Sequence, residues 1–227
     1  MMATVGLREE YLVPLYSQTE AARIVGTSTS SLHRWVEGYH RAASHSWNAP
    51  LVTLARHGRG LTVPFVGLAE AFVLASFRAA GLPMQRIRPA VEALKRGMGV
   101  EHALASKQLV TDGAEILWRS GEGDPDKRLV VVRNNQAVFR EVVEDYLRGI
   151  NYEFGYTSSF ALPQYEGVEV TVDPHINGGR PTIARRGVSV ADVVGRVDAG
   201  EGVRDIAEDY GLASEEVWAL VGGPPQR

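Results

Sequence analysis

The 227-residue sequence predicts a mainly α protein with short β-hairpins, made of an N-terminal winged helix-turn-helix and a C-terminal three-helix domain preceded by a β-hairpin. Two capped helical segments joined by a glycine lie near the N-terminus, and three short helical segments separated by glycines end the chain. Short apolar runs bounded by turn residues lie between them. We place the domains at 1–100 (winged helix-turn-helix with a helical extension), 101–164 (α+β connecting region) and 165–227 (helical domain).

The composition excludes several classes of protein. With 44% hydrophobic and 22% charged residues, the chain is neither disordered nor collagen-like. Its longest apolar stretch is too short to span a bilayer, and its first residues do not form a signal segment. The absence of Cys excludes disulfides, a thiol nucleophile and Cys-ligated metals. We therefore expect a cytoplasmic protein with no membrane partner and no cofactor.

The helix-turn-helix is predicted from its caps. Ser17 stands at an N-cap position with Glu20 three residues later, the pattern of a capping box, and the helix ends at Gly26. Ser28 or Thr29 then caps a second helix. The apolar residues of that helix, at helical spacing, are Leu32, Trp35 and Val36. The side chains left outside can bond base edges and phosphates; they are Thr29, Ser30, Ser31, His33 and Arg34.

A basic hairpin is predicted as the wing. Apolar runs at 50–54 and 60–63 flank a Gly-rich tip, where Arg56 and Arg59 are expected to reach an adjacent groove or the DNA backbone. Two apolar helices are expected next, at 67–80 and 84–96, the second kinked or started again at Pro89.

The connecting region mixes short elements. We expect a hairpin over 108–118 with an Asp-Gly turn, a strand at 129–132 and an amphipathic helix over 137–147. Residues 149–165 are rich in aromatic side chains and are predicted to form a loop that packs over a neighbouring domain.

The C-terminal segment begins with a strand at 168–172 and a turn. Asn177-Gly178 suits a turn that needs positive φ, and Pro181 stiffens the return, so that Arg180 projects from a rigid loop. Three short helices are expected after it, at 190–198, 203–210 and 214–221.

Charge separates the two helix-turn-helix-like ends. Residues 1–100 carry 11 Lys and Arg against 6 Asp and Glu, a net +5, whereas residues 101–227 carry 13 against 21, a net −8. Neutralisation of phosphates supplies much of the affinity for DNA, so the basic half is the better DNA binder. We assign DNA binding to the first unit and protein contact to the last three helices.

Residues 14–40 resemble the MerR-type winged helix. The matching residues are Tyr16-Ser17, Glu20-Ala21-Ala22-Arg23-Ile24, Thr27-Ser28 and Leu32-His33-Arg34-Trp35. The resemblance implies that this unit docks in a DNA groove, with an arginine near Arg34 contacting the duplex. That family usually passes directly into a short hairpin, whereas residues 40–49 intervene here.

The run Asp173-Pro174-His175-Ile176-Asn177-Gly178-Gly179-Arg180-Pro181-Thr182-Ile183 resembles a C-terminal domain family known only as of unknown function 433. Its pattern is a Pro, then Gly-Arg-Pro-x-Ile, then a polar link to three helices. Ile206-Ala207-Glu208-Asp209-Tyr210-Gly211-Leu212 and Glu216-Val217 match as well, so the resemblance spans about 165–222. Arg185-Arg186-Gly187 departs from the family's more frequent Gly-Thr-Arg.

The combined layout resembles VapB-type antitoxins of the larger, two-domain kind. The resemblance implies an antitoxin that binds operator DNA, represses its own operon and neutralises a PIN-type ribonuclease toxin; two-fold operators suggest a homodimer. An inhibitor can offer arginine to the carboxylates that hold the nuclease metal. The candidate toxin-binding residues are Asn177, Arg180, Arg185 and Arg186.

Two other functions stay open. The apolar helices near 67–96 could hold a small effector of a MerR-like regulator, or the chain could be an interaction adaptor that does not bind DNA. The sequence contains no phosphate-binding Gly-rich motif and no zinc-protease motif, so we do not expect an enzyme. The spacing of the histidines near the N-terminus fits no common zinc site; these are His33, His40, His45 and His57.

Overall fold

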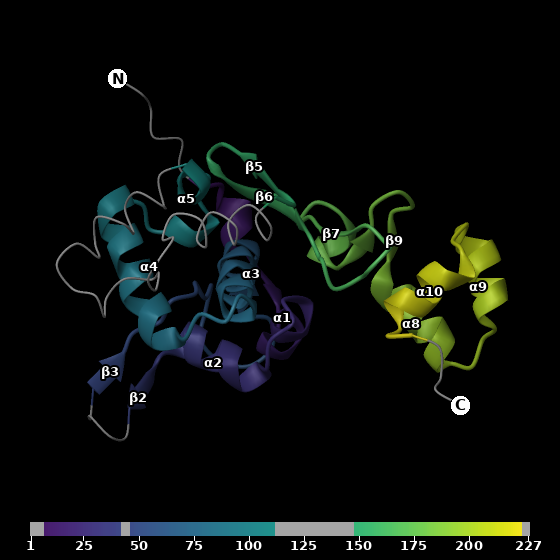
Figure 1. The fold of residues 1–227 in the computed structure, drawn as a ribbon, viewed down its shortest axis with the longest axis horizontal. Helices are drawn as coiled ribbons and strands as arrows, with labels where there is room; N and C mark the ends of the chain where they lie inside the picture. The colour runs from purple at the N-terminus through teal and green to yellow at the C-terminus, as the bar shows by residue number, and fades with distance from the viewer. Residues whose placement is uncertain (1–6, 42–45, 112–147, 224–227) are drawn as a thin grey trace. The chain divides into compact units, whose positions relative to one another are not determined.

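The computed structural model describes residues 7–41, 46–111 and 148–223 (Figure 1). The chain divides into two compact units, an N-terminal unit (1–157) and a C-terminal unit (158–227). The strand predicted at 129–132 and the helix predicted over 137–147 lie outside the described residues. Within the described ranges, no helix is long and apolar enough to cross a membrane.

The predicted helix-turn-helix is confirmed. Helix α1 (Gln18–Ile24) begins where the Ser17 hydroxyl accepts the Glu20 N–H at 3.1 Å, and helix α2 (Thr29–Glu37) begins where the Ser28 hydroxyl accepts the Ser31 N–H at 3.1 Å. Ser28, not Thr29, is therefore the N-cap of α2. The apolar side of α2 is buried as expected, through Leu32, Trp35 and Val36.

A short hairpin follows α2 directly. Strand β2 (Tyr39–Arg41) pairs antiparallel with β3 (Ser46–Asn48), and we call this pair the wing hairpin. Gly38 makes the connection with φ of 73°, and a Cβ on it would lie 2.5 Å from the carbonyl oxygen of Asn48. Only glycine therefore lets the chain turn straight from the helix into the hairpin.

The wing predicted from residues 50–63 is in the wrong place. Residues 50–62 form a loop, and β4 (Val63–Pro64) pairs antiparallel with β1 (Pro14–Tyr16) instead. The apolar run at 50–54 has another use: the N–H groups of Leu51 and Val52 donate to the carbonyl of Trp35, at 2.8 and 3.1 Å, and both side chains are buried. This run satisfies the end of α2 rather than pairing as a strand.

Helix α3 (Phe65–Ala79) is the centre of the N-terminal unit and is buried along most of its length. Gly67 allows the loop at 50–62 to approach it, because a Cβ on Gly67 would lie 2.2 Å from the carbonyl oxygen of Thr53. Helix α4 (Met84–Met98) runs through Pro89 as one helix, so the restart expected at that residue is wrong. Pro89 lies on the exposed side of α4.

The connecting region differs most from prediction. Residues Gln108–Thr111 form a short helix, α5, rather than the first strand of a hairpin, because the Ser106 hydroxyl accepts the Gln108 N–H at 3.2 Å and starts a helical turn. The rest of the hairpin expected over 108–118 lies outside the described residues.

Two strands, β5 (Ile150–Glu153) and β6 (Tyr156–Ala161), replace the loop expected at 149–165. Their connection has positive φ at Phe154 and Gly155, 50° and 86°. A tight hairpin turn requires positive φ at both positions. Phe rarely adopts positive φ, so this turn could not be recognised from the sequence. Burial raises the pKa of Tyr152 in β5 to about 12.

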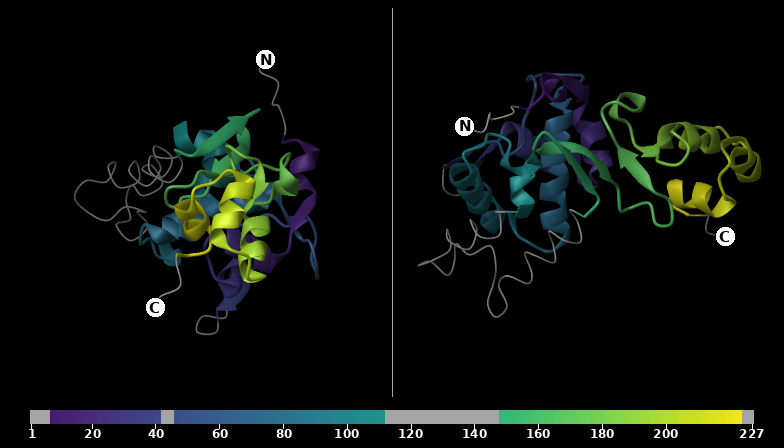
Figure 2. Two further views of the ribbon diagram at one scale, coloured as in Figure 1. Left: turned by 90° about the vertical axis from the view of Figure 1, so that its right-hand side faces the viewer. Right: turned by 90° about the horizontal axis from the view of Figure 1, so that it is seen from above.

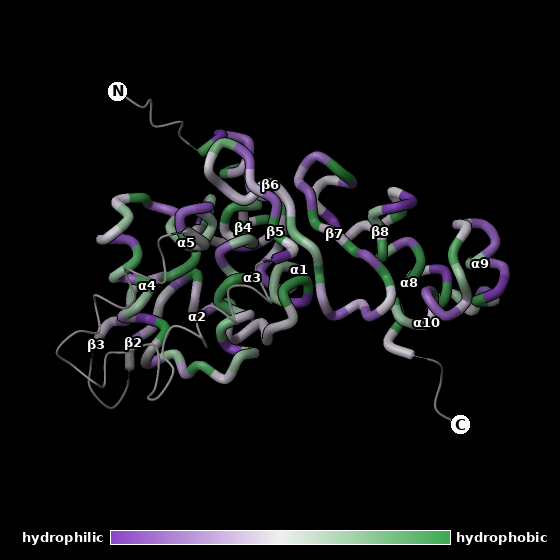
Figure 3. The backbone as a smooth tube through the Cα atoms, turned by 45° about the horizontal axis from the view of Figure 1, so that its top comes forward, coloured by the Kyte–Doolittle hydropathy of each residue, from purple (hydrophilic) through white to green (hydrophobic). Residues whose placement is uncertain are grey.

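The C-terminal unit matches its prediction closely. Strands β7 (Val170–Val172), β8 (Thr182–Ile183) and β9 (Val188–Ser189) continue the sheet in the order β5-β6-β7-β8-β9. The helices are α8 (Val190–Asp198), α9 (Val203–Tyr210) and α10 (Ser214–Leu220), which pack together in the views of Figure 2. Charged and apolar residues alternate along α9 at helical spacing (Figure 3), and its apolar side faces the core.

Candidate nucleic-acid interface

The five predicted DNA-binding residues of α2 lie together on the surface of that helix. Thr29, Ser30, His33 and Arg34 are exposed and Ser31 is half-buried. In the first turn, the Ser28 hydroxyl donates to Ser31 at 2.9 Å and lies 3.1 Å from the Ser30 hydroxyl. The hydroxyl groups are thus held as one cluster at the helix N-terminus, where the macrodipole favours a phosphate.

A chain of polar contacts ties α2 to its neighbours. His33 Nδ1 lies 2.9 Å from Gln18 Oε1, and Gln18 donates to Glu37 at 3.3 Å. Glu37 also lies 2.7 Å from His57 Nδ1, on the loop at 50–62. The end of α2 is therefore fixed both to α1 and to this loop.

The same loop carries Arg56 and Arg59, which the sequence placed on a hairpin tip. Both are exposed, and the Arg56 Nε donates to the carbonyl of Leu61 at 2.9 Å. Because His57 joins the loop to Glu37, these arginines are attached to α2 without belonging to a wing. Their role in DNA binding stays a prediction.

The wing hairpin contributes aromatic residues that sequence reasoning missed. Trp47 is 53% exposed and its ring centroid lies 4.9 Å from that of His40 across the hairpin. Tyr39 lies beneath Arg34, whose guanidinium is 5.8 Å from the ring centroid. The available signal was one aromatic residue in each strand, Tyr39 in β2 and Trp47 in β3, since aromatic residues are enriched in strands.

The four candidate toxin-binding residues have different environments. Asn177, with φ of 50°, donates its side-chain amide to Thr182 Oγ1 and to the carbonyl of Gly187, both at 3.0 Å, and so holds the loop at 173–181 on the following turn. Arg180 is exposed, and its side chain makes no hydrogen bond or ion pair with the residues the structure describes. Ile176 in the same loop is 44% exposed.

Arg185 is engaged within its own unit. It forms an ion pair with Glu216 and donates to the carbonyl of Gly211 at 3.1 Å. The guanidinium of Arg186 lies beside Gly211: a Cβ on Gly211 would lie 2.8 Å from Arg186 Nη2. Arg185 therefore fixes α10 to the β8–β9 turn, and Arg180 is the candidate most available to a partner.

The Arg185–Glu216 pair makes the C-terminal unit sensitive to acid. The Arg185 hydrogen bond and the Ala213 N–H, which donates at 2.7 Å, hold the pKa of Glu216 below 4.5. A lowered folded-state pKa adds stability that is present above pH 4.5 and lost as the pH falls through the folded pKa. Because the Arg185 side chain is 45% exposed and solvent screens the ion pair, we expect a loss below about 1 kcal/mol.

Urea unfolding at pH values above and below 4.5 checks this expectation. Glu216→Gln should remove that part of the acid dependence, and Glu215→Gln, at an exposed neighbour, should behave as the wild type. An unchanged pH profile for Glu216→Gln would contradict the assignment.

Comparison with known proteins assigns both ends of the chain. Residues 14–91 match a family described as "Putative DNA-binding HTH domain", and residues 170–221 match the family described as "Protein of unknown function (DUF433)". The first match contains α1, α2, the wing hairpin and the loop with Arg56 and Arg59. The second contains the loop with Arg180 and the three C-terminal helices.

A Mycobacterium tuberculosis protein named "Putative antitoxin VapB45" is 42% identical over 219 residues, which cover 90% of this chain and 91% of that protein. The chain belongs to the VapB45 family. A second M. tuberculosis relative, "Uncharacterized protein Rv2308", is 27% identical over 212 residues, covering 89% and 87%. The crystal structure of Rv2018 from M. tuberculosis matches with a TM-score of 0.76 at 40% identity, over 92% of this chain and 97% of that one. The shared family thus extends over both units.

Proposed function

We propose that this protein is the antitoxin of a type II toxin–antitoxin pair, that it represses its own operon as a DNA-bound homodimer, and that it neutralises a PIN-type ribonuclease. The observation that carries the proposal is the combination, in one chain of the VapB45 family, of a helix-turn-helix with an exposed polar recognition helix and a rigid loop that projects Arg180.

In this function α2 enters the major groove. Ser30 and Arg34 are exposed and can bond base edges or phosphates. Leu32 is buried and packs α2 onto the rest of the unit. The wing hairpin and the loop that carries Arg56 and Arg59 both adjoin the C-terminal end of α2 and would contact the flanking backbone. Two-fold symmetry of the operator is the reason to expect two copies.

Neutralisation of the toxin would use the other unit. A PIN nuclease holds its divalent metal between carboxylates, and an arginine from an inhibitor can pair with such carboxylates through two hydrogen bonds. Arg180 suits this role because the rest of its loop is fixed by Asn177. A preorganised loop loses less entropy on binding.

The proposal is tested by co-expression with the product of the adjacent gene. We expect the two proteins to co-purify and the ribonuclease activity of the partner to be inhibited. A neighbour that is not a nuclease, or one that does not associate, would refute the antitoxin assignment. The remaining functions would be a MerR-like regulator that responds to a small molecule and an interaction adaptor that does not bind DNA.

Arg34→Ala tests the recognition helix. We expect the variant to bind a duplex of its own upstream region about tenfold more weakly, because one guanidinium contact contributes about 1–3 kcal/mol. A mobility-shift titration measures this, with Arg96→Ala, at an exposed position near the end of α4, as the matched control. Equal shifts for Arg34→Ala and wild type would remove Arg34 from the interface, and no shift for either would indicate an adaptor.

A further inference from the structure

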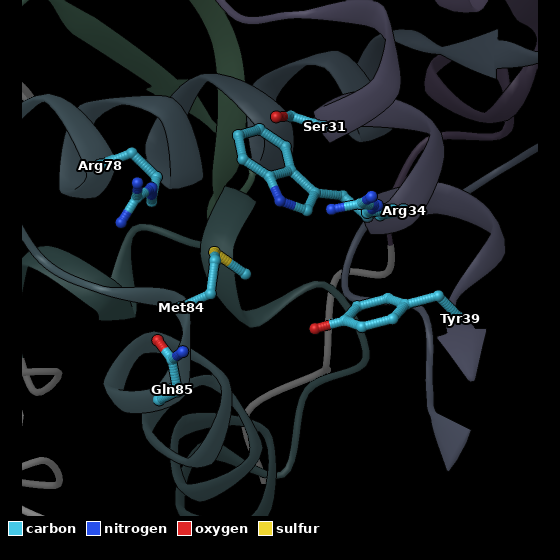
Figure 4. A pocket seen from close by; sticks show the side chains of 7 residues that line it. Ser31, Arg34, Tyr39, Arg78, Met84 and Gln85 are labelled. Carbon is cyan, nitrogen blue, oxygen red and sulfur yellow. The ribbon is translucent and has the colours of Figure 1, made fainter. Parts of the chain in front are cut away.

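A polar pocket lies beside the recognition helix, in the N-terminal unit. It has a volume of about 290 Å³ and is formed by α2, the start of β2, the last turn of α3 and the first turn of α4 (Figure 4). The polar side chains that line it are Ser31, Arg34, Tyr39, Arg78 and Gln85. None of the lining residues is acidic.

Two arginines line opposite sides of this pocket. Figure 4 shows Arg34 next to Tyr39 on one side and Arg78 on the other. Arg78 donates to the carbonyl of Leu82 at 2.7 Å, which holds its head group in place, and Arg34 lies over the Tyr39 ring. Among the described residues, neither arginine has a carboxylate partner. Two uncompensated positive charges at one cavity favour an anion.

A third arginine stands behind the Tyr39 wall. The guanidinium of Arg88 lies 5.6 Å from the centroid of the same Tyr39 ring and donates to the carbonyl of Ala49. Arg88 is only 9% exposed, and its Nη2 is buried without a hydrogen-bond partner in the described part of the chain. Burial lowers the pKa of Arg88, so its positive charge is held there at a cost.

The backbone at the start of α4 adds to the positive electrostatic potential of the pocket. Helix α4 begins at the pocket, with Met84 and Gln85 in its lining. Its N-cap, Pro83, offers no side-chain cap, and its first turn contains no acidic residue. The free N–H groups of a helix N-terminus carry partial positive charge, which here adds to that of the arginines.

We propose that this pocket binds a phosphate group, held by Arg34 and Arg78 with the Ser31 hydroxyl and the Gln85 amide as further donors. The cavity is larger than one phosphate, which leaves room for the group that carries it. That phosphate belongs either to the DNA backbone beside α2 or to a free small molecule that would compete with DNA for Arg34. Only the first source rests on the proposed function.

The test uses the full chain and the exposed residue Arg78. Wild type and Arg78→Gln are compared in two measurements: thermal unfolding with inorganic phosphate against chloride at equal ionic strength, and binding of two duplexes, the upstream region and an unrelated sequence. Arg96→Gln on α4 is the control for loss of an exposed charge. Equal melting temperatures in chloride establish that the variants fold.

A free ligand predicts that phosphate raises the melting temperature of wild type saturably, that Arg78→Gln loses this shift, and that both bind DNA equally in its absence. A backbone phosphate predicts that Arg78→Gln binds both duplexes about tenfold more weakly and lowers the slope of log K against log salt by about one. If Arg78→Gln matches the wild type in both measurements, the pocket does not bind phosphate. If wild type binds neither duplex, the proposed function fails, and the phosphate titration alone still decides the pocket.

Discussion

Replacing Glu70 with Ala should lower the free energy of unfolding of the N-terminal unit by about 2–5 kcal/mol, because each buried polar group left without its partner costs about 1–3 kcal/mol. Glu70 lies on α3 and is fully buried. Its carboxylate accepts the Thr53 N–H at 2.7 Å and lies 3.3 Å from His102 Nδ1, which is also 3.0 Å from Thr53 Oγ1. Removing the carboxylate leaves the Thr53 N–H and the His102 ring without this partner in the interior.

Urea unfolding followed by circular dichroism measures this loss. Glu70→Gln keeps an oxygen for the Thr53 N–H and should cost less, about 1–2 kcal/mol. Glu101→Ala, at an exposed carboxylate next to His102, is the matched control and should change stability by less than about 0.5 kcal/mol. If Glu70→Ala were as stable as Glu101→Ala, the buried cluster would have no structural role.

Charge reversal of Arg180 should abolish neutralisation of the toxin. In Arg180→Glu a carboxylate would meet the carboxylates of the nuclease, and losing a buried charge pair costs about 2–5 kcal/mol, which corresponds to roughly a hundredfold weaker complex or more. The expectation rests on the proposed function. Because Arg180 is exposed and its side chain makes no hydrogen bond or ion pair with the described residues, the fold should not change.

The measurement is titration calorimetry of the variant against the purified toxin, with inhibition of RNA cleavage as a second readout. Arg204→Glu, an exposed arginine on α9, provides the same change of charge outside the loop. Wild-type affinity for Arg180→Glu would assign the toxin contact to another surface, and equal losses in both variants would indicate a general effect of charge.

Local signals were enough to predict the two ends of the chain. Ser17 and Ser28 bond the first-turn N–H groups as their caps predict, and Leu32 is buried as its spacing requires. The three C-terminal helices fall within one or two residues of their predicted bounds because glycines separate them. Helix caps and the glycines that end helices act between residues close together in the chain, so they can be predicted from the sequence alone.

The elements that could not be predicted from the sequence depend on contacts between residues far apart in the chain. The run at 50–54 has the composition of a strand, yet its N–H groups bond Trp35, a partner that only the folded chain brings near. The turn at Phe154-Gly155 lacks the usual Asn or Asp, and the two strands that it joins, β5 and β6, lie where a loop was predicted. Arg78 ends an apolar helix, so nothing local connected it with Arg34.

The pairing of β7 with Phe160 and Ala161 limits how the C-terminal unit can be isolated. A fragment that starts at residue 170, where the family match begins, would lose both partners and the fully buried Phe160 ring. The outer edge of β7 would then offer unpaired N–H and C=O groups to other chains, which promotes aggregation. A fragment of residues 158–227 keeps this edge covered, so insolubility of a shorter fragment would reflect a bare strand rather than a defect of the three-helix core.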